Sequence, residues 1–361
     1  MTDLKKTSLY NKHIELNAKM LPFAGYQMPI NYPLGIQKEY DFVRNSVGMF
    51  DVSHMGQIKI FGKESKNLIE KITVNNVDNL QDGDAQYSAI CNISGGIIDD
   101  IILYKLKRDE FLLVVNGANR EKVYNWIVKN NNYDCSLFDQ TLNHSLIAIQ
   151  GPDSRNKLEE ILKEKISLKF YTHKYCKINS VKFLLSRTGY TGELGFELLG
   201  DINIINKIWD ELIDAGVHPC GLAVRDILRM EMKYCLYGKD INEDLNPIEA
   251  GLSWIVNNNK NFIGKESIQL VKKNGPEKKL RCIKMIDRCI PRTGYDIMSN
   301  ELVVGKVTSG TFSNSLKAGI ALAYISSNVN ISDTIYLEIR GKKYRGQIVS
   351  PPFITNTSLH N

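Results

Sequence analysis

An adjacent pair of acids, Asp99 and Asp100, is the feature of the sequence with the clearest chemical potential. The pair lies in an otherwise apolar segment after the turn Gly95-Gly96. An ionised carboxylate is costly to bury unless it is paired or hydrogen-bonded, so packing alone rarely selects two of them here. A carboxyl group in apolar surroundings has a raised pKa, which suits proton handling or a hydrogen bond to a ligand. A structural pair that caps nearby loops is an equal alternative.

A strand over 97–104 would separate the two acids, because successive side chains of a strand point to opposite faces. One predicted face carries Ile97, Asp99, Ile101 and Leu103, and the other carries Ile98, Asp100, Ile102 and Tyr104. Each face is apolar around a single acid, so we expect the strand to be buried on both sides. One Asp could then hold backbone donors near the turn while the other faces a pocket, and the pattern does not decide which.

A glycine-rich segment over 186–197 is the second candidate. Its glycines permit tight turns and close approach of the backbone to a ligand, but it has neither the spacing and lysine of a P-loop nor a Gly-x-Gly-x-x-Gly motif. Glu197 begins a predicted strand, and its carboxylate could accept two parallel N–H bonds from the guanidine-like edge of a heterocycle. A hairpin with a surface glutamate is an equally good interpretation of this segment alone.

A predicted helix over 223–232 carries the third candidate, Arg225. Asp226 and Arg229 are spaced to pair on the helix surface. Arg225 follows Gly221 by about one turn and could bind an anionic ligand such as a carboxylate. Ordinary salt bridging along the helix is the simpler alternative.

The remaining candidates for catalysis or metal binding are weak. His54 follows Asp51 and Ser53, but no Gly-x-Ser-x-Gly motif accompanies it, and we predict a packing or loop-organising role. The seven cysteines form no Cys-x-x-Cys motif, so we predict no metal site, no disulfide framework and no cysteine nucleophile. This cysteine usage indicates a reducing compartment, and without a recognisable leader segment the expected location is cytoplasmic.

The elements that must position these residues predict an α+β fold. Helical periodicity covers 38–47, 65–72, 120–129, 153–165, 202–215 and 223–232. Strand-like runs cover 57–61, 89–93, 97–104, 111–116, 145–150, 181–186 and 195–199. From about Lys278 the pattern changes to short strands separated by glycine turns, which indicates a small C-terminal β-barrel.

Length and composition are those of a globular protein with two or three domains. The chain has 361 residues, of which 43% are hydrophobic and 24% are charged. Its net charge of +6 is spread along the sequence, and no basic arm typical of nucleic-acid binding is present. No apolar run approaches the roughly 18 residues of a membrane span. We therefore expect neither nucleic acid nor a membrane as a partner.

In their order along the chain, these segments resemble the T-protein of the glycine cleavage system, the aminomethyltransferase family. The resemblance covers nearly the whole chain. It includes Val47-Gly-Met-Phe-Asp-Val-Ser-His-Met-Gly56, Gly95-Gly-Ile-Ile-Asp-Asp100 and Arg187-Thr-Gly-Tyr-Thr-Gly-Glu193, together with blocks at 19–29, 114–119, 150–152, 236–238, 308–313 and 351–353. So many blocks in one order make a chance match improbable.

The resemblance implies a three-domain cloverleaf around a central tetrahydrofolate site. Domain 1 would be discontinuous, over 1–50 and 142–275, and would bind folate. Domain 2 would cover 51–141 and carry Asp100, and domain 3 would be the barrel over 276–361.

The resemblance also implies a reaction. The one-carbon unit of an aminomethyl group on the lipoyl arm of H-protein would pass to tetrahydrofolate. Ammonia, 5,10-methylenetetrahydrofolate and dihydrolipoyl H-protein would be the products, and no metal or flavin would be needed. By position, Asp100 matches the acid that engages the folate amine, Glu197 matches the pterin anchor, and Asp99 is expected to be structural. The folate pocket would be lined by Tyr87, Val115, Asn116, Tyr190 and Arg225.

Three other protein classes share parts of this pattern. A demethylase of dimethylsulfoniopropionate uses the same fold with tetrahydrofolate. A folate-binding iron–sulfur assembly factor carries Lys-Gly-Cys-Tyr-x-Gly-Gln-Glu, where this chain has Lys233-Tyr-Cys-Leu-Tyr-Gly-Lys-Asp240, so we interpret Cys235 as an incidental helix residue. Flavin-linked dimethylglycine and sarcosine enzymes carry a dinucleotide-binding half, and no such half precedes the matching blocks here.

Overall fold

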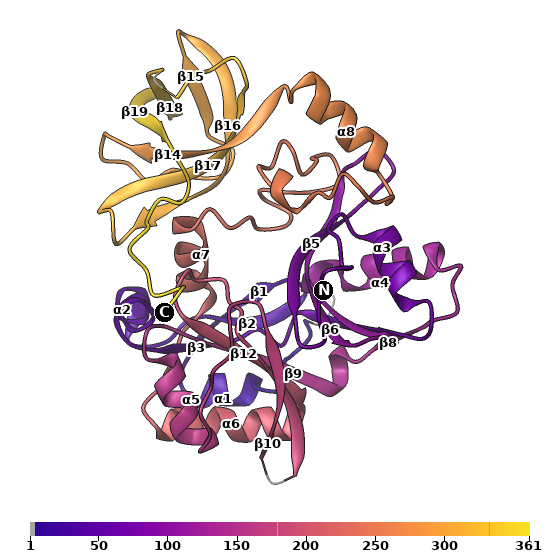
Figure 1. Cartoon of the computed structure of the whole chain (residues 1–361). Coiled ribbons are helices and arrows are strands. Elements are labelled where there is room, and N and C mark those ends of the chain that lie inside the picture. The colour runs from indigo at the N-terminus through magenta and orange to yellow at the C-terminus, as the bar shows by residue number, and fades with distance from the viewer. Residues whose placement is uncertain (1–3, 179, 332) are drawn as a thin grey trace.

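Two open sheets, a closed barrel, a two-stranded hairpin and their covering helices make up the fold, seen in a computed structural model that describes residues 4–178, 180–331 and 333–361. Figure 1 shows the three parts as separate lobes, with the orange and yellow barrel above, the sheet of β5 and β6 to one side, and the sheet of β9 and β12 below. The predicted α+β class with a C-terminal barrel is confirmed. Within the described residues, no helix is long and apolar enough to cross a membrane.

A six-stranded sheet forms the lower part of the molecule. Its strand order is β10-β11-β12-β9-β3-β13. The strands are β3 (Gly48–Asp51), β9 (His144–Gln150), β10 (His173–Ile178), β11 (Val181–Ser186), β12 (Gly195–Asp201) and β13 (His218–Pro219). The associated helices are α1 (Tyr10–Glu15), α2 (Gly35–Asn45), α5 (Ser154–Leu162), α6 (Ile202–Asp214) and α7 (Leu222–Glu231), and a hairpin of β1 (Lys19–Phe23) and β2 (Tyr26–Asn31) lies beside them.

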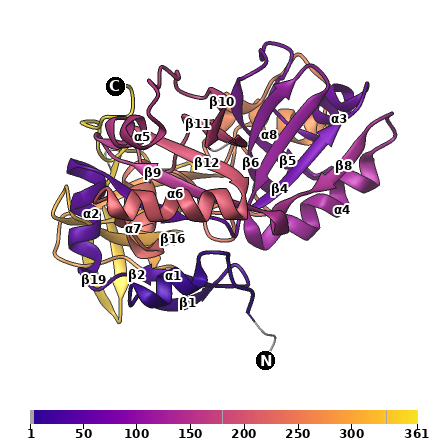
Figure 2. The same cartoon turned by 90° about the horizontal axis from the view of Figure 1, so that it is seen from below.

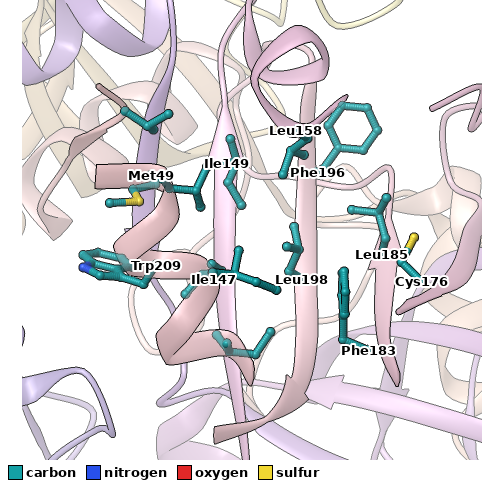
Figure 3. Close-up of a cluster of buried hydrophobic side chains, with 14 of the residues drawn as sticks. Met49, Ile147, Ile149, Leu158, Cys176, Phe183, Leu185, Phe196, Leu198 and Trp209 are labelled. Atoms are coloured by element: carbon teal, nitrogen blue, oxygen red, sulfur yellow. The ribbon is translucent and has the colours of Figure 1, made fainter. Parts of the chain in front are cut away.

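One face of this sheet is buried beneath α5 and α6. Figure 3 shows the alternate apolar side chains of β9, β11 and β12 packing against Leu158 of α5 and Trp209 of α6. Helix α6 begins at a capping residue, Asp201, whose side chain accepts the Asn203 backbone N–H, and its apolar positions recur at helical spacing. This cluster is the main core of the lower part.

A five-stranded sheet carries the acid pair. Its order is β5-β6-β7-β4-β8, with β4 (Gly56–Phe61), β5 (Ala85–Cys91), β6 (Ile97–Lys107), β7 (Glu110–Val115) and β8 (Ser136–Asp139). One face packs against α3 (Ser65–Ile72) and α4 (Arg120–Asn130), which Figure 2 shows on the outer side of the sheet. The other face of this sheet packs against the six-stranded sheet, α2 and α7, through Tyr104, Val114, Phe50, Leu184 and Val224 among others. Side chains at this junction therefore meet those of the other sheet.

The barrel closes in the order β14-β17-β16-β15-β18-β19, with β19 pairing back to β14. Its strands are β14 (Lys278–Met285), β15 (Asp296–Ser299), β16 (Leu302–Ser313), β17 (Ala318–Ser326), β18 (Ile335–Ile339) and β19 (Lys342–Val349). A connecting segment with the short turn η3 (Ser253–Ile255) and helix α8 (Lys265–Asn274) leads into it. Because the chain leaves the lower sheet after β3 and returns at β9, we propose the domain boundaries predicted from the sequence.

The strand faces predicted around Ile97 need correction, and one hairpin was not predicted. Ile90 pairs with Asp99 but Cys91 pairs with Ile97, so Ile98 is the extra residue of a β-bulge. Ile98 therefore packs beneath α3 and α4, and the faces predicted for Ile97 and Ile98 were wrong, whereas the alternation holds from Asp99 onward. The sequence also gave no indication of the β1–β2 hairpin, whose strands contain prolines and lie outside the two larger sheets.

Candidate functional site

Asp100 is a partly exposed carboxylate held by two neutral donors. The Tyr87 hydroxyl donates to Oδ2 at 3.0 Å, and the Asn116 amide donates to Oδ1 at 2.8 Å. Tyr87 reaches it because Ala89 of β5 lies opposite Asp100 of β6, which puts Tyr87 two residues along on the same face. Burial raises the pKa of Asp100, while the two donors oppose that rise. The carboxylate is thus oriented by two neutral donors, and no cation pairs with it among the described residues.

Asp99 is fully buried on the opposite face and accepts three hydrogen bonds. Its donors are the Asn116 backbone N–H at 2.9 Å, the Asn116 amide at 2.9 Å and the Asn119 amide at 2.7 Å. Burial and the adjacent charge of Asp100 raise the pKa of Asp99. Its contacts join the end of β7 to the turn η1 (Gly117–Asn119) before α4. The Asn116 amide contacts both carboxylates and so fixes one relative to the other.

Val115 does not present its side chain to Asp100. It is completely buried in the cluster beneath α3 and α4, together with Val123 and Ile127. Asn116 is the first residue beyond β7 and is partly exposed. The structure therefore brings the Asn116 side chain to the acid pair, whereas Val115 offers only its backbone on that side.

Glu197 of β12 faces the same junction from the six-stranded sheet. Leu199, two residues along the same strand, packs in the cluster that also holds Tyr104 of β6. Thr188 donates its hydroxyl hydrogen bond to Glu197 Oε2, and the Tyr104 hydroxyl lies 3.3 Å from the Thr188 hydroxyl. Because Asp100 and Tyr104 share a face of β6, Glu197 and Asp100 point into the same region from opposite sheets.

Tyr190 and Arg225 form the third side of this region. The Arg225 guanidinium lies 4.7 Å from the centre of the Tyr190 ring, a cation–π distance. Tyr190 also donates its hydroxyl hydrogen bond to the Cys235 carbonyl and stacks on Tyr234 at 5.7 Å between ring centres. Among the described residues, the buried Arg225 Nη1 has no hydrogen-bond partner. Burial lowers the pKa of Arg225, and the nearby charge of Glu197 opposes this.

Tyr190 is the residue of this region that is affected by charges on both sides of it. Burial raises the pKa of Tyr190 above its usual range. Arg229 opposes the rise most strongly, Asp100 adds to it, and Arg225 also opposes it. The structure thus gathers six predicted side chains around one region: Tyr87, Asp100, Asn116, Tyr190, Glu197 and Arg225.

Sequence reasoning missed further side chains of this region. Tyr104 could have been found, because strand alternation places it on the Asp100 face. Thr188 lies inside the glycine-rich segment, but nothing local to it marks its contact with Glu197. Trp254 on η3 stacks on Tyr87 at 5.8 Å between ring centres and is 69% exposed, which is unusual for an indole. A lone tryptophan in a connecting segment carries no sequence signal for such a place.

Cys235 and His54 lie in buried surroundings that do not favour a reactive side chain. Cys235 lies in the loop after α7, not in the helix as predicted, and its contribution is the carbonyl that binds Tyr190. Burial raises the pKa of its thiol to about 12, so the thiol stays protonated. His54 is buried with its ring against Phe23 and Tyr26. Within the described ranges no three His, Cys, Asp or Glu residues are grouped as metal ligands.

Comparison with known proteins links this geometry to one family. Residues 9–260 match the family model of the GCVT N-terminal domain, and residues 278–354 match that of the glycine cleavage T-protein C-terminal barrel domain. The chain is 42% identical to an aminomethyltransferase of Thermotoga maritima over 97% of its own length and 98% of that protein. It is 41% identical to an aminomethyltransferase of Halothermothrix orenii, with 97% and 100% covered. The crystal structure of glycine cleavage system aminomethyltransferase T from Bartonella henselae superposes with a TM-score of 0.93 at 32% identity, covering 98% of this chain and 99% of that one.

Proposed function

The chain belongs to the glycine cleavage T-protein family and is an aminomethyltransferase, and on this basis we propose that it moves the aminomethyl carbon of lipoyl H-protein to tetrahydrofolate. The observation that carries the assignment to this site is Asp100. It is a partly exposed carboxylate, oriented by Tyr87 and Asn116. Tyr190, whose pKa is affected by the charges of both Asp100 and Arg225, lies between the two, and Arg225 Nη1 has no hydrogen-bond partner among the described residues.

We assign the folate-binding roles from the groups that remain free to bind. Glu197 accepts hydrogen bonds from the pterin edge, and Thr188 orients its carboxylate. Arg225 binds an acceptor or anionic group of the folate, which would satisfy its open donor. The Tyr190 ring lies beside Arg225, Asn116 holds Asp100, and Val115 contributes backbone only.

The reaction breaks two bonds to the transferred carbon and forms two. The S–CH2 bond to the lipoyl arm and the C–N bond to the leaving ammonia break, and bonds from the carbon to two folate nitrogens form. The two hydrogens displaced from those nitrogens end on sulfur and on ammonia, so the products are ammonia, dihydrolipoyl H-protein and 5,10-methylenetetrahydrofolate. Asp100 stabilises the cationic carbon and takes up a proton from the attacking amine, and its raised pKa suits the second task.

The lipoyl arm needs a route to Asp100 from solvent. The exposed Trp254 stacks on Tyr87, whose hydroxyl binds Asp100, so we place the approach of the arm on the Trp254 side. We also propose a cytoplasmic location. It rests on cysteine chemistry, since all seven cysteines are free thiols, as expected of a reducing compartment.

The test is a single-turnover measurement of 5,10-methylenetetrahydrofolate formed from aminomethyl-loaded H-protein and tetrahydrofolate. We expect strong stimulation by the wild-type chain. Asp100→Asn keeps the shape but removes the charge, and we expect it to lower the rate by about 10²- to 10⁴-fold, the range typical of losing a positioned acid–base group.

A matched variant, Asp287→Asn, removes an acid that pairs with Arg345 on the barrel surface, far in sequence from the site. We expect it to leave the rate unchanged. A wild-type chain that fails to stimulate the reaction would refute the proposed function. An Asp100→Asn variant with near-normal rate would refute only the role of Asp100. Replacing loaded H-protein by dimethylsulfoniopropionate, and measuring 5-methyltetrahydrofolate instead of 5,10-methylenetetrahydrofolate, tests the demethylase alternative.

A further inference from the structure

Arg44, near the end of α2, binds two elements that both carry site residues. Its Nη1 donates to the Thr191 carbonyl at 2.9 Å and to Glu193 at 2.6 Å, and its Nη2 donates to Glu231 at 2.6 Å. The side chains of Arg44, Glu193 and Glu231 are 8%, 3% and 0% exposed. One guanidinium therefore joins the glycine-rich segment to the last turn of α7.

The barrel and the C-terminal tail bind the same two carboxylates. Ser313 of β16 donates its hydroxyl to Glu231, and the Phe353 N–H donates to the Glu231 carbonyl at 2.9 Å. Ser358 donates its backbone N–H to Glu193 at 2.8 Å, and its hydroxyl donates to the same oxygen. Figure 1 shows the yellow tail running from the barrel down to α2 and α7. We call Arg44, Glu193, Glu231 and Ser358 the clasp.

The clasp is close in sequence to the folate-binding groups on both elements it joins. Thr191 directly follows Tyr190 in the glycine-rich segment. Glu231 lies on the same helix as Arg225, less than two turns away. The 4.7 Å contact between Tyr190 and Arg225 joins the same two elements, the glycine-rich segment and α7. No hydrogen bond between these two side chains holds the contact in place.

We infer that Arg44 is a positioning residue for tetrahydrofolate binding: it sets the distance between the Tyr190 segment and α7, and the tail, through Ser358, secures the same contact. Arginine suits this task because its planar fork binds two carboxylates at fixed angles, whereas lysine offers a point charge. The inference rests on the proposed function, since it assigns Tyr190 and Arg225 to the folate site.

Arg44→Lys tests the inference, because it keeps the charge but cannot bridge both carboxylates with the same geometry. We expect the KM for tetrahydrofolate to rise about tenfold, equivalent to about 1.4 kcal/mol. We expect kcat to stay within about twofold, because Asp100 and its donors are untouched. Ser358→Ala removes one tail donor and should raise the same KM by a smaller factor.

The matched control is Arg120→Lys. Arg120 pairs with Asp139 at 2.6 Å with both side chains at most one-fifth exposed, but it contacts neither the glycine-rich segment nor α7. We expect a similar loss of thermal stability without a change in the KM for folate. All variants are assayed at a temperature at which circular dichroism shows them folded.

The outcomes separate the two hypotheses. If the wild-type chain forms no methylenetetrahydrofolate, the proposed function fails and this inference with it. If the wild type is active and Arg44→Lys changes the folate KM no more than Arg120→Lys does, the clasp is only structural and the inference is overturned. If Arg44→Lys does not fold, Ser358→Ala and Ser313→Ala decide: an unchanged folate KM in both overturns the inference.

Discussion

The first and second turns of α7 each carry an arginine, and the two arginines differ in how many hydrogen-bond partners the protein gives them. Arg229 is 1% exposed and saturated: it binds Asp226 at 2.8 Å, the Tyr234 carbonyl at 3.0 Å, Ser309 at 2.9 Å and also Asp240. Arg225, one turn earlier, lies over the Tyr190 ring and has a buried donor without a partner in the described part of the chain. The two residues differ in what surrounds them, not in type.

We interpret this difference as one between structural groups and groups that bind a ligand. Buried polar groups in native proteins are almost always hydrogen-bonded, so an open donor on a buried guanidinium needs an explanation. The acid pair repeats the contrast on β6: Asp99 accepts three donors and is fully buried, whereas Asp100 keeps part of its surface open. We therefore propose that Arg229 and Asp99, whose hydrogen bonds are satisfied within the protein, are structural, and that Arg225 and Asp100 bind the ligand.

The largest effect that can test this contrast is expected from Arg229→Met. The substitution leaves Asp240, which is fully buried, without its cation. Removing one partner of a buried ion pair costs about 3–5 kcal/mol, so we expect a large fall in the free energy of unfolding. Urea denaturation measures it. A loss below about 1 kcal/mol would show that the Arg229 contacts are not structural, and the contrast would fail.

A smaller effect, on binding, is expected from Arg225→Met. No hydrogen-bond partner in the described residues is lost, but the cation–π contact with Tyr190 is, so the free energy of unfolding should change by no more than about 1 kcal/mol. The affinity for tetrahydrofolate should fall by about 10- to 100-fold, which is what a hydrogen bond from a charged group contributes. Calorimetric titration with tetrahydrofolate measures it, and Arg229→Met should not mimic it once the fraction folded is allowed for. Undiminished folate affinity would remove Arg225 from the site.

The sequence predicted the strands and helices where periodicity is strong and local. The ranges 65–72 and 181–186 coincide with α3 and β11, and the barrel begins at Lys278 as expected. The bulge at Ile98 was invisible, because an extra residue in one strand is defined only by pairing with the partner strand. The predicted placement of Asp99 and Asp100 on opposite faces of the strand is nonetheless correct, because the bulge lies before Asp99.

The contrast between open and saturated groups could not be predicted from the sequence. Asp226 and Arg229 pair as their spacing indicated, but Asp240 and Ser309 reach Arg229 only through the fold. Glu197 and Asp100 point into one region because the two sheets that carry them pack face to face, which no local pattern encodes. The resemblance to a family pointed to both residues, whereas the side chains that orient them, such as Thr188, emerged only from tertiary contacts.

The smallest effect is electrostatic, at His54. Burial lowers the pKa of His54 from 6.5 to about 4; Asp51 opposes this, and the positive charge of Arg225 lowers it further. Arg225→Met should therefore raise the pKa of His54 slightly, since the positive charge that disfavours the imidazolium form is removed. Titration of the His54 ring by NMR measures it. The folded protein holds His54 neutral, so between pH 6.5 and about 4 only the unfolded chain takes up this proton, and stability falls as the pH falls through that window. A pKa that does not move in the variant would mean that the Arg225 charge is already neutralised locally. The guanidinium would then belong with Arg229, among the saturated groups.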